Sequence, residues 1–175
     1  LLRRLGELYL EVKDFVSGLS ALRQAVTFFP NNVETRVVSK RMINQFSSIY
    51  TDGTADSMTP LTALSMYDQF RELTPVGRRG DRIIQRLADR LVEVDLLDRA
   101  SVLLDRQVKF RLRGKQKAIV GSKLALIRLL DRQPRLALDA LNESVSPGLD
   151  SRLALERKRL RSRSVFELGD SESAL

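Results

Sequence analysis

Apolar residues recur along this chain at spacings of three and four, the pattern of helices that each bury one face. In residues 1–30, two such apolar stripes flank a break at Val12-Lys13-Asp14-Phe15. Pro30 ends the second stripe, because proline lacks an amide hydrogen and clashes with the preceding helical turn. The pattern predicts two helices that fold back on each other.

The same arrangement returns along the rest of the chain. A helix is expected at residues 33–50, followed by a polar, glycine-containing loop at 51–59. Pro60 suits the first turn of a return helix, where its missing donor costs nothing, and Asp81 suits the N-cap of the next helix. Further breaks between helices are expected at 94–98 and 131–134, and a last helix at about 151–168 leads to a turn at 169–170. Ala174 would open one more helix.

Small residues recur in one helical register at Gly18, Ala63, Ala100, Ala137 and Ala174. The last three steps are each 37 residues, and the first step of 45 contains the eight extra residues of the 51–59 loop. A period in this range is typical of helical repeats, because two antiparallel helices approach closely only where side chains are small. The expected repeats are 1–30, 31–75, 76–113, 114–149 and a partial fifth at 150–175.

These residues carry a resemblance to a known family. The string Leu5-Gly6-x-x-Tyr9, followed by Gly18, Leu22, Ala25 and Pro30, resembles one tetratricopeptide repeat. Later repeats keep the small crossing residues, although they are 37 residues long where the family has about 34. The resemblance covers essentially the whole chain and implies an all-α fold, a right-handed α-solenoid of antiparallel helix pairs. A compact, irregular helical bundle is the alternative.

The resemblance also implies that the first helix of each pair lines a concave surface that holds a peptide. That surface would combine basic rims with an apolar centre at Leu126 and Leu129, which suits an extended or helical peptide. Aligned on Ala88, the residues expected to face the partner are Arg82, Gln85, Arg86, Asp89 and Glu93 in the third repeat, Ser122, Lys123, Leu126, Leu129 and Leu130 in the fourth, and Arg159, Arg163 and Phe166 in the fifth. The second repeat would add Lys40, Arg41 and Asn44.

Some tetratricopeptide domains hold a C-terminal carboxylate in a clamp of basic residues and asparagines. Arg3, Arg82 and Arg86 occupy three of the corresponding places here, but Glu7 and Arg41 stand where asparagines belong. Glu7 would repel a carboxylate. We therefore expect no clamp of this kind.

Charge is distributed unevenly along the chain. Residues 1–75 hold 8 basic and 8 acidic side chains, whereas residues 76–175 hold 22 and 14, so the whole net charge of +8 lies in the second part. Basic clusters at 106–117 and 157–163 dominate it. Such a charge is the minimum signature of a nucleic-acid binder, but aromatic residues that could stack on bases are scarce there. An acidic protein partner explains the charge equally well.

The chemistry available to the chain is narrow. It contains no cysteine and no histidine, which excludes thiolate nucleophiles, disulfides, imidazole bases and zinc sites built from those residues. No run approaches the roughly 18 apolar residues of a membrane span, and the compartment stays open. The sequence predicts a non-catalytic scaffold that binds a protein or peptide without metal or cofactor. A nucleic-acid-binding repeat, a spacer within a larger repeat protein, and self-association through exposed repeat ends are the alternatives.

Overall fold

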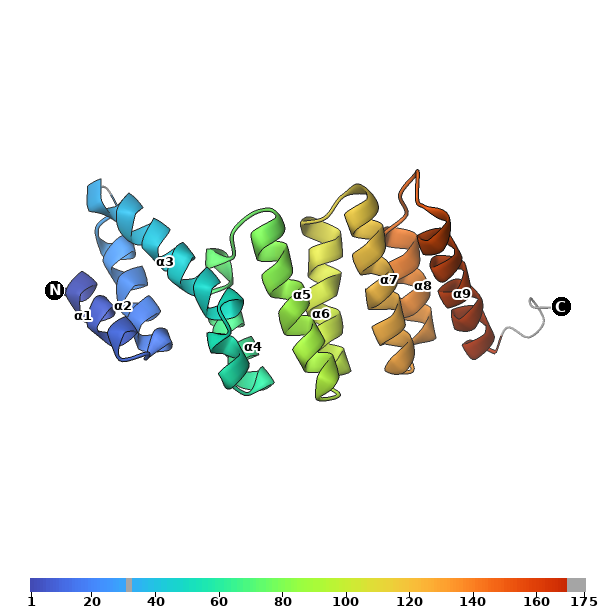
Figure 1. Cartoon of the computed structure of the whole chain (residues 1–175), viewed down its shortest axis with the longest axis horizontal. Helices are drawn as coiled ribbons and strands as arrows, with labels where there is room; N and C mark the ends of the chain where they lie inside the picture. The colour runs from blue at the N-terminus through green and yellow to red at the C-terminus, as the bar shows by residue number, and fades with distance from the viewer. Residues whose placement is uncertain (31–32, 170–175) are drawn as a thin grey trace. The chain divides into compact units, whose positions relative to one another are not determined.

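The computed structural model describes residues 1–30 and 33–169, and every regular element in these ranges is helical. Figure 1 shows the elements in chain order. They are α1 (Leu2–Glu11), α2 (Phe15–Phe28), α3 (Val33–Thr51), η1 (Thr54–Ser57), α4 (Pro60–Gln69), η2 (Arg71–Leu73), α5 (Arg78–Glu93), α6 (Leu97–Phe110), α7 (Gly114–Leu130), α8 (Pro134–Glu143) and α9 (Ser151–Glu167). The chain forms two compact units, Leu1–Ile83 and Ile84–Leu175, which we call the N-terminal and C-terminal units. The predicted all-α class is confirmed for the described residues.

In the N-terminal unit, α1 and α2 cross where two glycines meet. A Cβ atom on Gly6 would lie 2.7 Å from Cγ of Leu22, and one on Gly18 would lie 2.7 Å from Cγ of Leu10. Real Cβ atoms do not approach other atoms so closely, so any larger residue would force the facing leucine or the helix itself to shift. The crossing at small residues that the sequence predicted is confirmed here.

The core of the same unit continues in an aromatic cluster between α3 and α4. The rings of Phe46 and Tyr50 lie 5.0 Å apart, and Tyr67 lies 6.2 Å from each of them. The Tyr50 hydroxyl donates to the carbonyl oxygen of Ala63 at 2.8 Å. This bond gives the hydroxyl of buried Tyr50 a partner inside the core.

The segment 51–59, expected to be a polar, glycine-containing loop, connects α3 to α4 and contains the short 3₁₀ helix η1. Gly53 turns the chain with a φ of 87°, and the side chain of Ala55 is buried. The polar composition of this segment gave no sign that one small side chain packs into the core.

The start of α5 also differs from the prediction. The helix begins at Arg78, directly after Gly77, whose φ of 77° turns the chain. Asp81 therefore lies in the first turn, where its amide donates to the carbonyl oxygen of Gly77, and it is not the N-cap. A carboxylate in the first turn still interacts favourably with the partial positive charge of the helix start.

In the C-terminal unit, α7, α8 and α9 lie side by side, and α6 packs against α7 (Figure 1). The predicted crossing residues Ala88, Ala100, Ala125 and Ala137 are all fully buried. α7 also lies close to the C-terminal end of α8 at Gly121, where a Cβ atom would collide with the side chain of Ser144. The predicted residue types thus occupy the helix contacts of both units.

The turns that follow α1, α5, α7 and α9 each contain a residue in the left-handed backbone conformation. Lys13, Asp95 and Arg132 adopt left-handed φ values of 63°, 61° and 56°, and Gly169 has a φ of 75°. The last three of these residues follow one another at steps of 37. The 37-residue period of the sequence therefore appears in the backbone as well. Lys13, Asp95 and Arg132 adopt this conformation although they are not glycine.

We expect Arg132→Gly to stabilise the protein by about 0.5–1 kcal/mol. A side chain in the left-handed region costs roughly 1–2 kcal/mol, and the greater freedom of glycine in the unfolded chain offsets only part of this. Chemical denaturation measures the change. The matched control is Arg106→Gly, at an exposed position inside α6, which should lose about 1 kcal/mol. Equal destabilisation by both substitutions would contradict this account of the turn.

Candidate functional site

α7 carries a row of exposed side chains at the spacing of one helix face. Ile119, Leu126 and Leu130 are 39%, 40% and 50% exposed. Lys123 lies on the same face and forms an ion pair with Asp89 of α5. We call Ile119, Lys123, Leu126 and Leu130 the α7 face. The sequence predicted its last three members as partner-facing residues and missed Ile119, which lies one turn before Lys123.

Two of the predicted partner-binding residues are buried instead. Leu129 is 2% exposed and Ser122 is 1% exposed. Consecutive residues of an α-helix point about 100° apart, so Leu129 turns into the core while Leu130 stays at the surface. The apolar centre of the surface is formed by Leu126 and Leu130, and the prediction for Leu129 and Ser122 was wrong.

Ser122 belongs to a buried polar cluster around Arg157 of α9. The Nη1 atom of Arg157 donates to the carbonyl oxygen of Ala118 at 2.9 Å and to Oγ of Ser122 and Ser144. Its Nη2 atom donates to the carbonyl oxygen of Leu141 at 2.6 Å. Burial, followed by the nearby charge of Arg161, lowers the pKa of Arg157.

The position of Leu141 explains how a buried guanidinium is stable without a carboxylate partner among these contacts. Leu141 lies in the last turn of α8, where carbonyl groups have no partner within the helix. The partial negative charge of that helix end attracts a cation. Arg157 thus caps α8 from the neighbouring helix α9.

We expect Arg157→Lys to lower the free energy of unfolding by about 2–3 kcal/mol. A lysine ammonium cannot reach acceptors on two helices from one planar group, so it leaves buried carbonyl groups without a donor. Denaturant unfolding followed by circular dichroism measures the loss. Arg161→Lys is the control, because Arg161 bonds Asn142 at the surface and should change stability by no more than about 0.5 kcal/mol. Equal effects of the two substitutions would show that Arg157 has no capping role.

The other predicted partner-binding residues are accessible to different degrees. Arg86, Asp89, Arg159 and Arg163 are exposed, and Gln85 is half-buried. Arg163 forms an ion pair with Glu167 at 2.7 Å. Arg82 is also exposed and precedes Arg86 by one turn of α5, but it belongs to the N-terminal unit.

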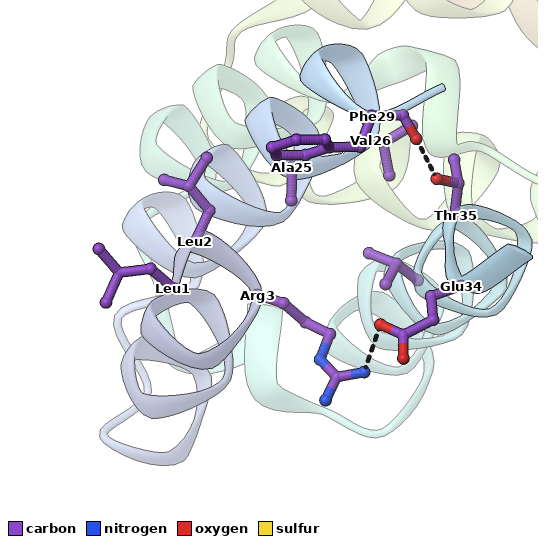
Figure 2. Close-up of a pocket in the computed structure, with 9 residues that line it drawn as sticks. Leu1, Leu2, Arg3, Ala25, Val26, Phe29, Glu34 and Thr35 are labelled. Atoms are coloured by element: carbon purple, nitrogen blue, oxygen red, sulfur yellow. Dashed lines mark hydrogen bonds and ion pairs between the residues drawn. The ribbon is translucent and has the colours of Figure 1, made fainter. Parts of the chain in front are cut away.

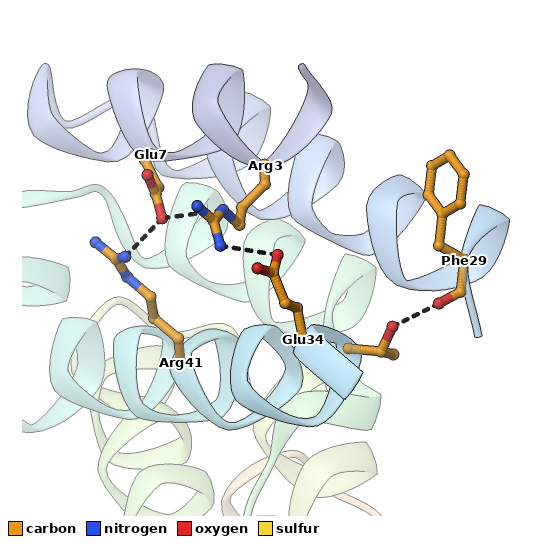
Figure 3. Close-up of polar contacts among 6 residues, drawn as sticks. Arg3, Glu7, Phe29, Glu34 and Arg41 are labelled. Atoms are coloured by element: carbon orange, nitrogen blue, oxygen red, sulfur yellow. Dashed lines mark hydrogen bonds and ion pairs between the residues drawn. The ribbon is translucent and has the colours of Figure 1, made fainter. Parts of the chain in front are cut away.

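Neighbouring first helices are joined by ion pairs in both units. In the N-terminal unit, Glu7 of α1 accepts from Arg41 of α3 at 2.7 Å, and Arg3 donates to Glu34 at 2.9 Å (Figure 3). The Asp89–Lys123 pair of the C-terminal unit has the same separation of 34 residues as Glu7–Arg41. Charges that looked available to a ligand in the sequence therefore bind each other between adjacent helices.

The basic clusters are partly neutralised in the same way. Lys109 contacts Asp105 at 2.8 Å, and this hydrogen bond raises the pKa of Lys109 against the opposing effect of desolvation. Lys115 contacts Asp150 at 2.7 Å, and it lowers the pKa of Asp150 together with the Leu153 amide. Because Arg157 is buried as well, fewer cations of these clusters are left unpaired at the surface than the sequence suggests.

A hollow of about 640 Å³ opens beside α3 in the N-terminal unit. We call it the α3 hollow. Its lining is polar and basic, apart from one valine. The lining residues are Val37, Lys40, Arg41, Asn44, Gln45, Ser48 and Arg79. Lys40, Arg41 and Asn44, which the sequence assigned to a partner-facing surface, are thus brought together on its wall.

A second hollow, of about 220 Å³, lies between α1, α2 and α3 (Figure 2). Its walls are mainly aliphatic, with Leu2, Ala25, Val26 and Val38 among them. Its two ionised residues, Arg3 and Glu34, are bound to each other. This arrangement offers space for an apolar group and no free charge for an anion.

Two kinds of feature are missing from the residues that the structure describes. Within residues 1–30 and 33–169, no group of three or more acidic, cysteine or histidine side chains could hold a metal ion. None of the helices in these ranges is both long and apolar enough to cross a bilayer.

No family model and no curated protein matches this chain. Among solved structures, the chain is similar to the crystal structure of MamA protein, with 21% sequence identity and a TM-score of 0.38. The match covers 96% of this chain and 86% of the other.

Proposed function

We propose that the protein is a non-catalytic scaffold that binds a protein or peptide partner on the α7 face and the exposed charges beside it. The observation that carries the proposal is the row of Ile119, Leu126 and Leu130. These side chains repeat at helical spacing, and each keeps more than a third of its surface in solvent. An apolar row between charged residues is the surface that an amphipathic helix or an extended apolar segment recognises.

The charged residues beside this row support a polar rim. Arg86 and Asp89 of α5 and Arg163 of α9 are exposed. Exposed charges at a rim add little affinity, but they accelerate encounter and select partners of complementary charge. The apolar contacts that a partner buries on the α7 face would supply most of the binding energy. The decisive test therefore substitutes the leucines of that face.

We expect Leu126→Asp/Leu130→Asp to weaken partner capture at least about tenfold. Each leucine would lose roughly 1 kcal/mol of apolar contact. The wild type and the variants are immobilised and exposed to nuclease-treated lysate, and the captured proteins are quantified by mass spectrometry. The matched control is Val102→Asp/Leu136→Asp, which changes two similarly exposed apolar residues on α6 and α8. Equal capture by both double variants would contradict binding on the α7 face.

A nucleic-acid-binding repeat is the second candidate, because the net charge of +8 lies in residues 76–175. Its affinity for a labelled single-stranded oligonucleotide would fall by about 10³ or more between about 50 and 200 mM salt if several phosphates are bound. Salt-sensitive oligonucleotide binding that is insensitive to the leucine variant would favour this candidate. Lys109 and Lys115 are each paired with an aspartate of the same chain, which favours the protein partner over nucleic acid.

A further inference from the structure

The α3 hollow combines free cations with free amide groups. Within the part of the chain that the structure describes, Lys40 and Arg79 form no ion pair, and Arg41 is paired with Glu7. The hollow therefore holds two positive charges that no side chain of the described residues neutralises. We infer that it is a second binding site, and that its ligand is a peptide segment with several side-chain carboxylates.

The shape of the hollow suits an extended segment. It is shallow and open to solvent, so a ligand would lie across it and would not be enclosed. Lys40 and Asn44 are one helical turn apart on α3, a rise of about 6 Å. Alternate side chains of an extended peptide point to the same side and are about 6.6 Å apart. Acidic residues at alternate positions would thus match the spacing of these two groups.

The uncharged groups favour a peptide over a nucleic acid. The side chains of Asn44 and Gln45 have no partner among the described residues, and each can both donate to and accept from a peptide backbone. Val37 is 68% exposed and offers an apolar contact. None of the lining residues is aromatic, so the bases of a single strand would find no stacking surface.

The cations open to a ligand lie on two helices. Lys40 is on α3 and Arg79 is in the first turn of α5, whereas Arg41 is already bound to Glu7. The side-chain carboxylates of the ligand therefore meet Lys40 and Arg79. A peptide whose C-terminus is amidated carries no terminal carboxylate and isolates this contribution.

The test uses the full chain and a fluorescent, C-terminally amidated peptide of alternating glutamate and leucine. The control peptide has glutamine in place of glutamate. Fluorescence anisotropy at low salt should show the glutamate peptide binding at least about tenfold more tightly than the glutamine peptide, because each charge-assisted hydrogen bond contributes about that factor.

We expect Lys40→Glu/Arg79→Glu to weaken glutamate-peptide binding at least about tenfold. The matched control, Lys13→Glu/Arg71→Glu, makes the same change in net charge at exposed residues of the same unit outside the hollow and should bind like the wild type. Circular dichroism verifies that both variants are folded. Asn44→Ala, which leaves the charges in place, should weaken binding several-fold.

Three results would overturn the inference. These are equal binding by the two double variants, equal binding of the glutamate and glutamine peptides, and binding of an oligothymidylate strand in place of the peptide. The variant Leu126→Asp/Leu130→Asp should retain the glutamate peptide. This variant therefore tests binding in the α3 hollow independently of binding on the α7 face.

Discussion

Close contact between paired helices at small side chains is the constraint on which the two units depend. At Gly6 and Gly18 the backbones of α1 and α2 are so near that an added methyl group would overlap a leucine. Between α7 and the end of α8, an added methyl group on Gly121 would overlap the side chain of Ser144 in the same way. Because the helices are this close, the larger side chains around each crossing interdigitate and exclude water, which is the main source of stability in such pairs.

Helices this close bury their ends as well as their faces, and buried carbonyl groups need donors. α8 is only ten residues long, so its last turn is a large part of its length. Arg157 reaches that turn from α9 and bonds Leu141. The buried cation is therefore a consequence of stacking short helices, and it joins α9 to α7 and α8 through one side chain.

The surface charges fall into two groups with different roles. Glu7 with Arg41 and Asp89 with Lys123 neutralise each other between neighbouring first helices. Exposed pairs of this kind add little stability. Their four charges are already paired with each other, so they are less available to a ligand. What is left for recognition is the apolar row of the α7 face and the unpaired cations of the α3 hollow. These two surfaces have different chemistry and suit different partners.

The sequence by itself determined the helices and most of their ends, because apolar spacing, proline and glycine act on the local backbone. It also determined which small residues are buried at the crossings, since their period is visible in one dimension. Only the tertiary structure decided that Leu129 is buried while Leu130 is exposed, that Ala55 packs in a 3₁₀ turn, and that Ser122 binds Arg157. Burial and pairing depend on which neighbouring helix lies against each face, and residues 23 to 39 positions apart, such as Asp105 with Arg128 or Ala118 with Arg157, meet only after the helices stack.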